Sequence, residues 1–179
     1  MVEPGTDKID FTASYYQDGK YKTLNFSEYA DKFVVLFFYP EDFGETITTQ
    51  MQLMGKRRDA FPSNTYCFGI STDSLEAHRF FVEDQLRENI GVEHIMPLIC
   101  DQTGKISKVF KVLNKDTFQA SLSCFIIDDI GTVLACMASD PRLGLDLEEV
   151  GRTVFAVQVS YKDFFKLENT TIFKICIYI

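Results

Sequence analysis

The run of seven apolar or aromatic residues from Phe33 to Tyr39, which ends at Pro40, is the feature that most constrains the fold. An uninterrupted apolar run predicts a strand buried on both faces, as in the centre of an α/β sheet. After a short polar elbow, helical spacing of apolar residues predicts a helix from Glu45 to Phe61. A buried strand that leads into a helix N-terminus directs backbone N–H groups toward one point, so we expect any chemistry at this elbow.

The rest of the chain predicts further strands and helices. An Asp18-Gly19 pair indicates a hairpin between residues 9 and 24, and Ser74 is a typical helix N-cap. The other expected elements are strands at 66–72 and 95–100, a short helix at 103–110, a hairpin of strands 123–127 and 132–138, and a last helix that starts near Asp146. A βαβ unit followed by a hairpin and a closing helix is the order of a thioredoxin-like α/β fold.

Several segments together resemble one known family. The segment 33–43 is similar to the active-site strand and elbow of the peroxiredoxins, which are thiol peroxidases with a thioredoxin fold. Further similarities follow at family-like separations without insertions, at Ile70–Ser74, His78, Met96–Asp101 and Phe125–Asp128. The resemblance extends from about Gly19 to about Ser160. It implies the peroxiredoxin type of thioredoxin-like fold, a mixed central β-sheet flanked by helices.

The positions that the resemblance assigns to the active site have lost their chemistry. A family member attacks the peroxide with a cysteine thiolate at the helix N-terminus, and an arginine lowers the thiol pKa and stabilises the developing charge. In gapless register the corresponding positions are Ile47, Thr48, Thr49, Gln50, Leu122 and Leu145. Ile47 takes the place of the cysteine, and Leu122 and Leu145 take the places of two arginines. The resemblance therefore predicts an apolar plug where the family has a charged pocket.

The remaining cysteines offer little replacement chemistry. Four lie within or beside apolar strand runs, where a thiol usually behaves as a small buried hydrophobe, namely Cys67, Cys100, Cys124 and Cys136. A three-residue hairpin loop at 129–131 would place Cys124 opposite Cys136, although a disulfide there is not expected in a cytosolic protein. Cys176 is the candidate thiol for an alternative function, because it lies in the C-terminal tail and not in a strand of the domain.

The leading functional hypothesis is a catalytically inactive peroxiredoxin homologue that acts as a structural, scaffolding or interaction subunit. The resemblance implies a homodimer or a ring of dimers. Phe43 would lie at one interface, and the other would comprise Val133, Leu134, Ala135, Cys136, Met137 and Ala138. Active peroxiredoxins are possible partners, and the alternating tail 171–179 could dock on its own domain, a symmetry mate or another protein. The alternative is a thioredoxin-linked, thiol-dependent peroxidase that uses a displaced cysteine.

Length, charge and composition limit the number of domains, the location and the kinds of function that the chain can have. The length of 179 residues predicts one domain, at 1–165, followed by an apolar tail or arm at 166–179. A net charge of −8 argues against nucleic-acid binding. The absence of a long apolar run and of a secretory leader predicts a cytoplasmic protein without a membrane partner. The two histidines have no clustered partners, so neither a metal nor a cofactor is expected.

Overall fold

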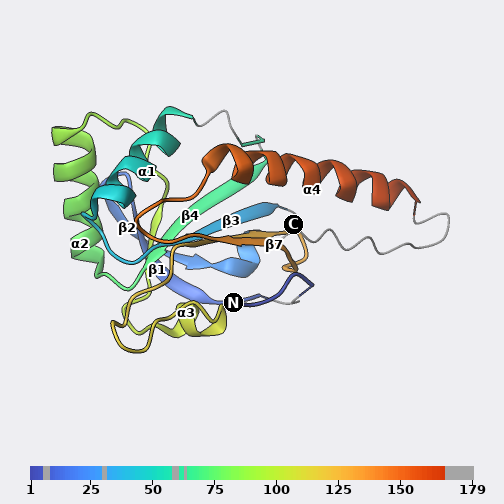
Figure 1. Cartoon of the computed structure of the whole chain (residues 1–179), viewed down its shortest axis with the longest axis horizontal. Coiled ribbons are helices and arrows are strands. Elements are labelled where there is room, and N and C mark those ends of the chain that lie inside the picture. The colour runs from blue at the N-terminus through green and yellow to red at the C-terminus, as the bar shows by residue number, and fades with distance from the viewer. Residues whose placement is uncertain (6–8, 30–31, 58–60, 63, 168–179) are drawn as a thin grey trace.

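The computed structural model describes residues 1–5, 9–29, 32–57, 61–62 and 64–167, with side chains described as far as residue 160 (Figure 1). The strands form a single sheet in the order β2-β1-β5-β4-β3-β6-β7. The strands are β1 Thr12–Gln17, β2 Lys20–Asn25, β3 Phe33–Phe38, β4 Thr65–Ser71, β5 Leu98–Cys100, β6 Ser123–Ile127 and β7 Val133–Ala138. The helices are η1 Phe26–Tyr29, α1 Glu45–Lys56, α2 Leu75–Phe80 with its π-helical continuation η3 Phe81–Asn89, α3 Lys105–Val109 and α4 Leu147–Leu167.

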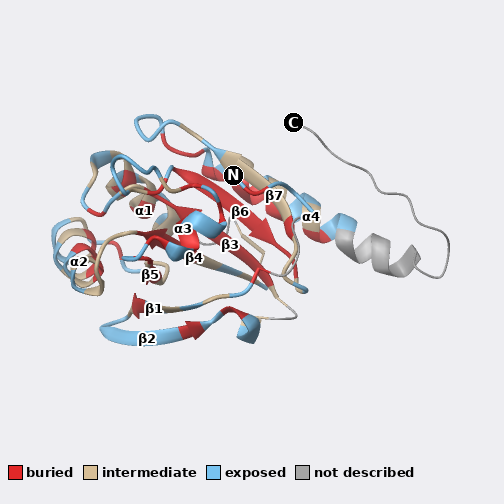
Figure 2. Ribbon diagram, turned by 90° about the horizontal axis from the view of Figure 1, so that it is seen from below, coloured by how far each residue is buried: buried red, intermediate tan, exposed pale blue. Residues whose placement is uncertain are grey.

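The predicted central strand is confirmed. All six residues of β3 are buried, and β3 pairs in parallel with β4 and in antiparallel with β6. Its side chains alternate between two apolar cores, with Leu36 and Phe38 in one and Val35 and Phe37 in the other. Figure 2 shows the buried residues concentrated in these inner strands and in the helix faces turned toward them. The sheet is mixed and flanked by helices, which confirms the predicted thioredoxin-like architecture.

The two cores lie on opposite faces of the sheet. Helices α1, α2 and α4 cover one face, and α3 covers the other together with the N-terminal segment (Figure 1). The Asp18-Gly19 hairpin is confirmed, since β1 and β2 are antiparallel and both turn residues have positive φ, as a type I′ turn requires. Among the described helices, none combines the length and the apolar character needed to cross a bilayer.

Three boundaries differ from the expectations. The helix α1 ends at Lys56 rather than Phe61, with Arg57 as its C-cap, because Gly55 lowers the helix propensity of the last turn and Pro62 disfavours a helical backbone just before it. The strand β5 begins at Leu98 rather than at residue 95, because Pro97 has no N–H to donate to the ladder. The helix α4 continues to Leu167, two residues past the predicted domain boundary.

A bulge in the last hairpin separates the two cysteines that were expected to face each other. The register is Ile127 opposite Val133 but then slips by one residue, so that Cys136 lies opposite Phe125 and Cys124 opposite Met137. A slip of one residue turns a side chain to the other face of the sheet. The predicted opposition of Cys124 and Cys136 is therefore wrong, and both thiols are free.

The strand β7 is an edge of the sheet, and the chain's own N-terminal segment covers part of it. The Gly5 N–H donates to the Val133 carbonyl at 2.7 Å, and the Ile9 N–H donates to the Gly131 carbonyl at 3.1 Å. Val133 is fully buried, whereas residues 134–137 are half-buried and Ala138 is exposed. Within the expected interface strand, Val133 is thus already engaged inside the protomer.

Candidate functional site

The elbow between β3 and α1 is the candidate site. It runs from Pro40 to Gly44, and α1 begins at Glu45 with an extended Gly44 as its N-cap, which offers no side-chain hydrogen bond. Ile47 lies in the first turn of α1 and is only 4% exposed. This position has the geometry that activates a nucleophile at a helix N-terminus, yet its side chain is a hydrocarbon with no proton to lose.

The residues predicted to replace the family's charged groups lie in one apolar core. Leu122 is 3% exposed and Leu145 is 7% exposed, and both belong to the same buried cluster as Ile47. Their elements are far apart in sequence, since Ile47 comes from α1, Leu122 from the residue before β6, and Leu145 from the loop before α4. The fold brings these three positions into one hydrophobic core with no charge among them.

Gln50 joins α1 to the loop before α4 through two hydrogen bonds. Its Nε2 donates to the Leu145 carbonyl at 2.9 Å, and its Oε1 accepts from the Leu145 N–H at 3.0 Å. An amide supplies one donor and one acceptor side by side, so it matches both backbone groups of a single residue. A carboxylate could satisfy only the N–H. The glutamine at this position therefore makes a pair of contacts that an ionised glutamate could not make.

The two threonines of the elbow region differ in their contacts. The Thr49 hydroxyl donates to the Glu45 carbonyl at 3.0 Å, one helical turn earlier. The Thr48 hydroxyl is buried and has no hydrogen-bond partner in the described part of the chain. Neither hydroxyl has a neighbouring base, so neither is arranged as a nucleophile.

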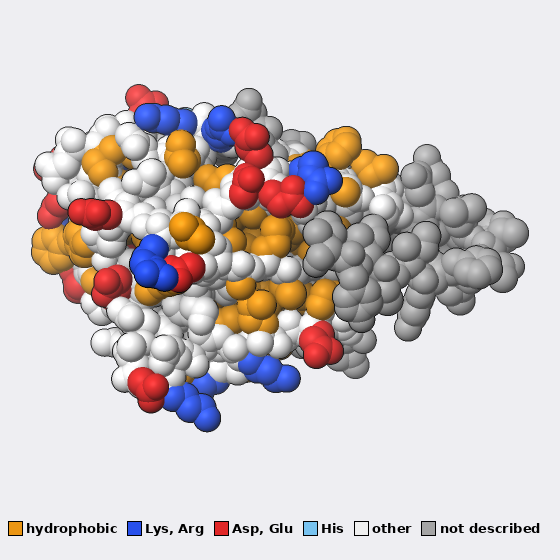
Figure 3. Space-filling view, in the orientation of Figure 1, with side chains coloured by type: hydrophobic (Ala, Val, Ile, Leu, Met, Phe, Trp, Pro, Cys, Tyr) orange, Lys and Arg blue, Asp and Glu red, His pale blue; other side chains and the backbone are white. Residues whose placement is uncertain are grey.

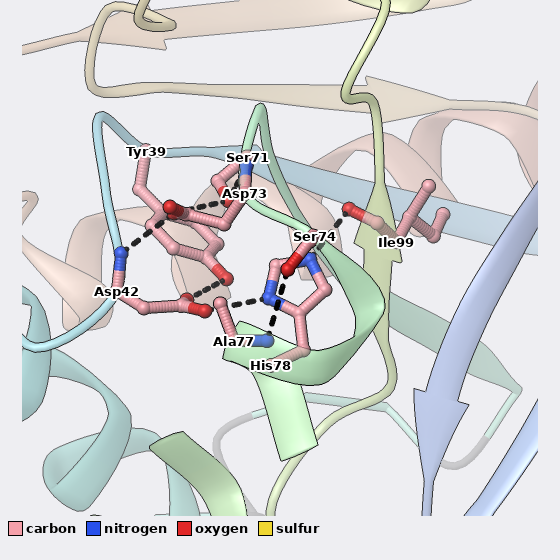
Figure 4. A network of polar contacts seen from close by, with 8 residues as sticks. All are labelled: Tyr39, Asp42, Ser71, Asp73, Ser74, Ala77, His78 and Ile99. Carbon is pink, nitrogen blue, oxygen red and sulfur yellow. Dashed lines mark hydrogen bonds and ion pairs between the residues drawn. The ribbon is translucent and has the colours of Figure 1, made fainter. Parts of the chain in front are cut away.

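A buried polar network fixes the other side of the elbow, as Figure 4 shows. The Asp42 carboxyl accepts from the Tyr39 hydroxyl at 2.9 Å and pairs with His78 Nδ1 at 2.8 Å. The Asp42 N–H donates to Asp73 Oδ2 at 2.8 Å, and the Ser71 hydroxyl donates to the same oxygen at 2.8 Å. These bonds tie the elbow to the end of β4 and to α2.

The geometry of this network leaves His78 without a free ring nitrogen to act as a catalytic base. His78 Nε2 lies 3.2 Å from the Ile99 carbonyl oxygen. His78 Nδ1 lies 2.8 Å from Asp42 Oδ2. Both ring nitrogens are engaged, and His78 is fully buried. Burial raises the pKa of Asp42 above its ordinary value, and the hydrogen bond from His78 opposes that rise.

This network was not anticipated from the sequence, although a signal for it exists. His78, Phe81 and Val82 share the buried face of one helix. A titratable side chain on an apolar helix face needs a buried partner. The acidic residues of the elbow were the candidates for the partner of His78, and in the structure that partner is Asp42.

Burial disfavours the thiolate form of three described cysteines. Burial raises the pKa of Cys67 to about 12, raises that of Cys124 well above its ordinary value, and also raises that of Cys136. A raised pKa leaves little thiolate at neutral pH. The candidate thiol Cys176 lies outside the described residues. Within the described ranges no three His, Cys, Asp or Glu side chains gather as a metal site would require.

The comparisons with known proteins agree with this geometry. Residues 4–135 match the model of the AhpC/TSA family. Peroxiredoxin-1 of Gekko japonicus is 33% identical over 156 residues, which cover 86% of this chain and 78% of that protein. A peroxiredoxin of Hyperthermus butylicus is 33% identical over 133 residues, 73% of this chain and 57% of that protein. The crystal structure of reduced Plasmodium vivax 2-Cys peroxiredoxin superposes with a TM-score of 0.82 at 26% identity, over 90% of this chain and 85% of that one. Fold, elbow and sequence agree, and the chain belongs to the AhpC/TSA family, the peroxiredoxins.

Proposed function

We propose that this chain is a non-catalytic peroxiredoxin that acts as a structural or interaction subunit. The observation that carries the proposal is the buried Ile47 in the first turn of α1, at the position where the family resemblance expects the peroxidatic cysteine. A peroxidase of this family needs a thiolate there and a cation beside it. Isoleucine and leucine supply neither.

The surroundings of Ile47 support the same reading. Leu122 and Leu145 leave no charge to stabilise a developing oxyanion, and an arginine in their place would be a buried charge without a partner. Burial raises the pKa of the Cys67, Cys124 and Cys136 thiols, which disfavours them as displaced nucleophiles. Cys176, the candidate thiol in the tail, is the target of the test below.

The assembly that we propose uses the free part of the β7 edge. Among the described strands, residues 134–138 of β7 pair only with β6 and are at least partly accessible, so their other side can pair with a second copy in a twofold, self-complementary contact. Phe43 would contribute to a second interface. It is 50% exposed, has a positive φ of 64°, and rests against the Phe81 ring at a centroid distance of 5.2 Å. Active peroxiredoxins with the same edge are candidate partners, and a cytoplasmic location suits them.

Peroxide consumption tests the catalytic half of the proposal. The reduced protein is incubated with hydroperoxide, thioredoxin and thioredoxin reductase, beside the Ile47→Cys, Leu122→Arg double variant. We expect no turnover and unchanged thiol masses in the native chain. Circular dichroism verifies that the double variant is folded, and a Cys176→Ser variant is run in parallel. Turnover that the Cys176→Ser change abolishes would establish a displaced nucleophile and overturn the proposal.

Sedimentation velocity tests the assembly half. We expect a dimer that the Leu134→Asp variant dissociates, because a carboxylate would enter the paired edge. Leu143→Asp is the matched control, since Leu143 is an exposed leucine outside the strand. Cys136 offers a second readout, because pairing along β7 should slow its alkylation. A native chain that sediments as a monomer at micromolar concentration, or a dimer that both variants leave intact, would refute the β7 interface.

A further inference from the structure

The segment around α3 carries several positive charges close together in the sequence. Residues 105–119 contain Lys105, Lys108, Lys111 and Lys115 but only one acidic residue, Asp116, within a chain of net charge −8. All four lysines are exposed, and none forms an ion pair in the part of the chain that the structure describes. Figure 3 shows basic side chains along the lower edge of the molecule, where Figure 1 places α3.

An exposed aromatic ring lies within this basic surface. Phe118 is 44% exposed, and Lys108 Nζ lies 5.8 Å from the centroid of its ring. The tip of the ring lies against Gly104, the N-cap of α3, where an added Cβ would come within 3.1 Å of the Phe118 Cζ. Phe118 and Lys108 are therefore neighbours, and the exposed residues of this segment, Lys105, Lys108, Lys111, Lys115 and Phe118, are called here the α3 surface.

Local folding preferences do not account for these side chains. Lys111 has a φ of 56° and Phe118 a φ of 57°, a left-handed backbone that glycine or asparagine adopts with less strain. Lys105 is the first residue of α3, where the positive end of the helix dipole disfavours a cation. Only Lys108, in the last turn, is favoured by that dipole. Large side chains kept at strained positions are a sign of function.

The turn that carries Phe118 is well ordered. Leu113 and Ala120 form an antiparallel bridge, and the Asn114 side chain accepts from the N–H groups of Asp116 and Thr117. Gln119 Nε2 donates to Glu41 Oε2 at 2.9 Å, which fixes the turn against the elbow. A turn held by these bonds lowers the entropic cost of ordering its backbone when a partner binds Phe118.

We propose that the α3 surface binds an acidic peptide segment that contains an aromatic or large apolar residue. Uncompensated lysines favour carboxylates, and the exposed face of Phe118 offers an apolar anchor beside them. The negative charge of the remaining chain opposes a long polyanion such as nucleic acid, whereas a short acidic segment needs only this small basic surface. The inference does not depend on whether the elbow is catalytic.

Fluorescence anisotropy with a labelled probe tests the proposal. The probe is a short fluorescein-labelled peptide of alternating glutamate and aspartate around one central tryptophan. We expect binding that weakens as salt increases, and a loss of about tenfold in affinity for the Lys105→Gln, Lys108→Gln variant. The Lys20→Gln, Lys22→Gln variant has the same change in charge, lies on β2, and should bind within about twofold of the native chain.

Two further variants separate binding from stability. Lys111→Gly should raise the melting temperature, because glycine relieves the left-handed backbone, and yet lower the affinity for the probe. Phe118→Asn should lower the affinity while the chain stays folded. Absence of binding at low salt would overturn the proposal, as would equal losses in the two lysine pairs. Tighter binding of a single-stranded oligonucleotide of equal charge, unaffected by Phe118→Asn, would assign the surface to nucleic acid and overturn it as well.

Discussion

The two hydrogen bonds between Gln50 and Leu145 allow a specific prediction about how the candidate site is held together. They connect residues 95 positions apart and join α1 to the loop that leads into α4. Gln50→Ala removes both bonds and leaves the N–H and the carbonyl of Leu145 without their partners. Leu145 is only 7% exposed, so water can replace those partners poorly.

The expected cost follows from these contacts. A net contribution of about 1 kcal/mol for each bond, plus part of the penalty for unpaired backbone groups, gives a loss of about 2–3 kcal/mol. For a chain of this size that loss lowers the melting temperature by about 4–12 °C. Urea denaturation measures it, and Gln52→Ala is the matched control on the same helix, with an expected change within about 0.5 kcal/mol. A Gln50→Ala variant as stable as that control would refute the reasoning.

The Gln50→Glu variant tests in which direction the loss of stability changes with pH. An ionised carboxyl can accept from the Leu145 N–H but repels the Leu145 carbonyl, so the folded state favours the protonated form and raises the pKa of the introduced group. The folded state then binds more protons than the unfolded state, and the stability deficit shrinks as pH falls through that raised pKa. The deficit of Gln50→Ala should not change with pH. Parallel pH profiles for the two variants would contradict the proposed donor role.

Two other buried groups give further predictions. Thr48→Val should raise the free energy of unfolding by about 1 kcal/mol, because it removes a buried hydroxyl without a partner and keeps the shape; an unchanged or lower value in urea denaturation would indicate an unseen partner. Asp42→Asn keeps an acceptor for Tyr39 and a group that can pair with His78, so the variant should fold. Because the pKa of Asp42 is raised in the folded state, its contribution to stability should fall as pH increases from the ordinary value of 3.8 through the raised one. Urea denaturation at a series of pH values across this range should therefore show that the free energy of unfolding loses this contribution as pH increases in the native chain, but not in Asp42→Asn.

Local sequence patterns predicted the elements that local forces determine. The apolar run at β3, the Asp-Gly turn between β1 and β2, and the Ser74 cap of α2 are all present, and Ser74 Oγ accepts from the Ala77 N–H. Each of these elements depends only on neighbouring residues. The strand depends on the burial of a continuous apolar stretch, the turn on positive φ, and the cap on an unpaired N–H at the helix start. Such preferences can be read without knowledge of distant parts of the chain.

The features that were missed depend on contacts between distant segments or on small local irregularities. The pairing of Asp42 with His78 joins an elbow to a helix that starts after another strand. The bulge near Leu134 changes the register of β7 by one residue, and no glycine or proline in that strand marks it. The N-terminal segment covers Val133 through backbone hydrogen bonds, which carry no side-chain signature.

The elbow is held from both sides by hydrogen bonds between distant segments. On one side Asp42 is bound by Tyr39, His78 and Asp73, and on the other Gln50 closes on Leu145. Between them, the helix start is filled by the buried Ile47. The Asp42 contacts hold the segment before α1, and the Gln50 contacts hold the second turn of α1, so together they favour a single folded elbow. The interaction subunit proposed above would gain from such an elbow, because it presents Phe43 in one fixed position.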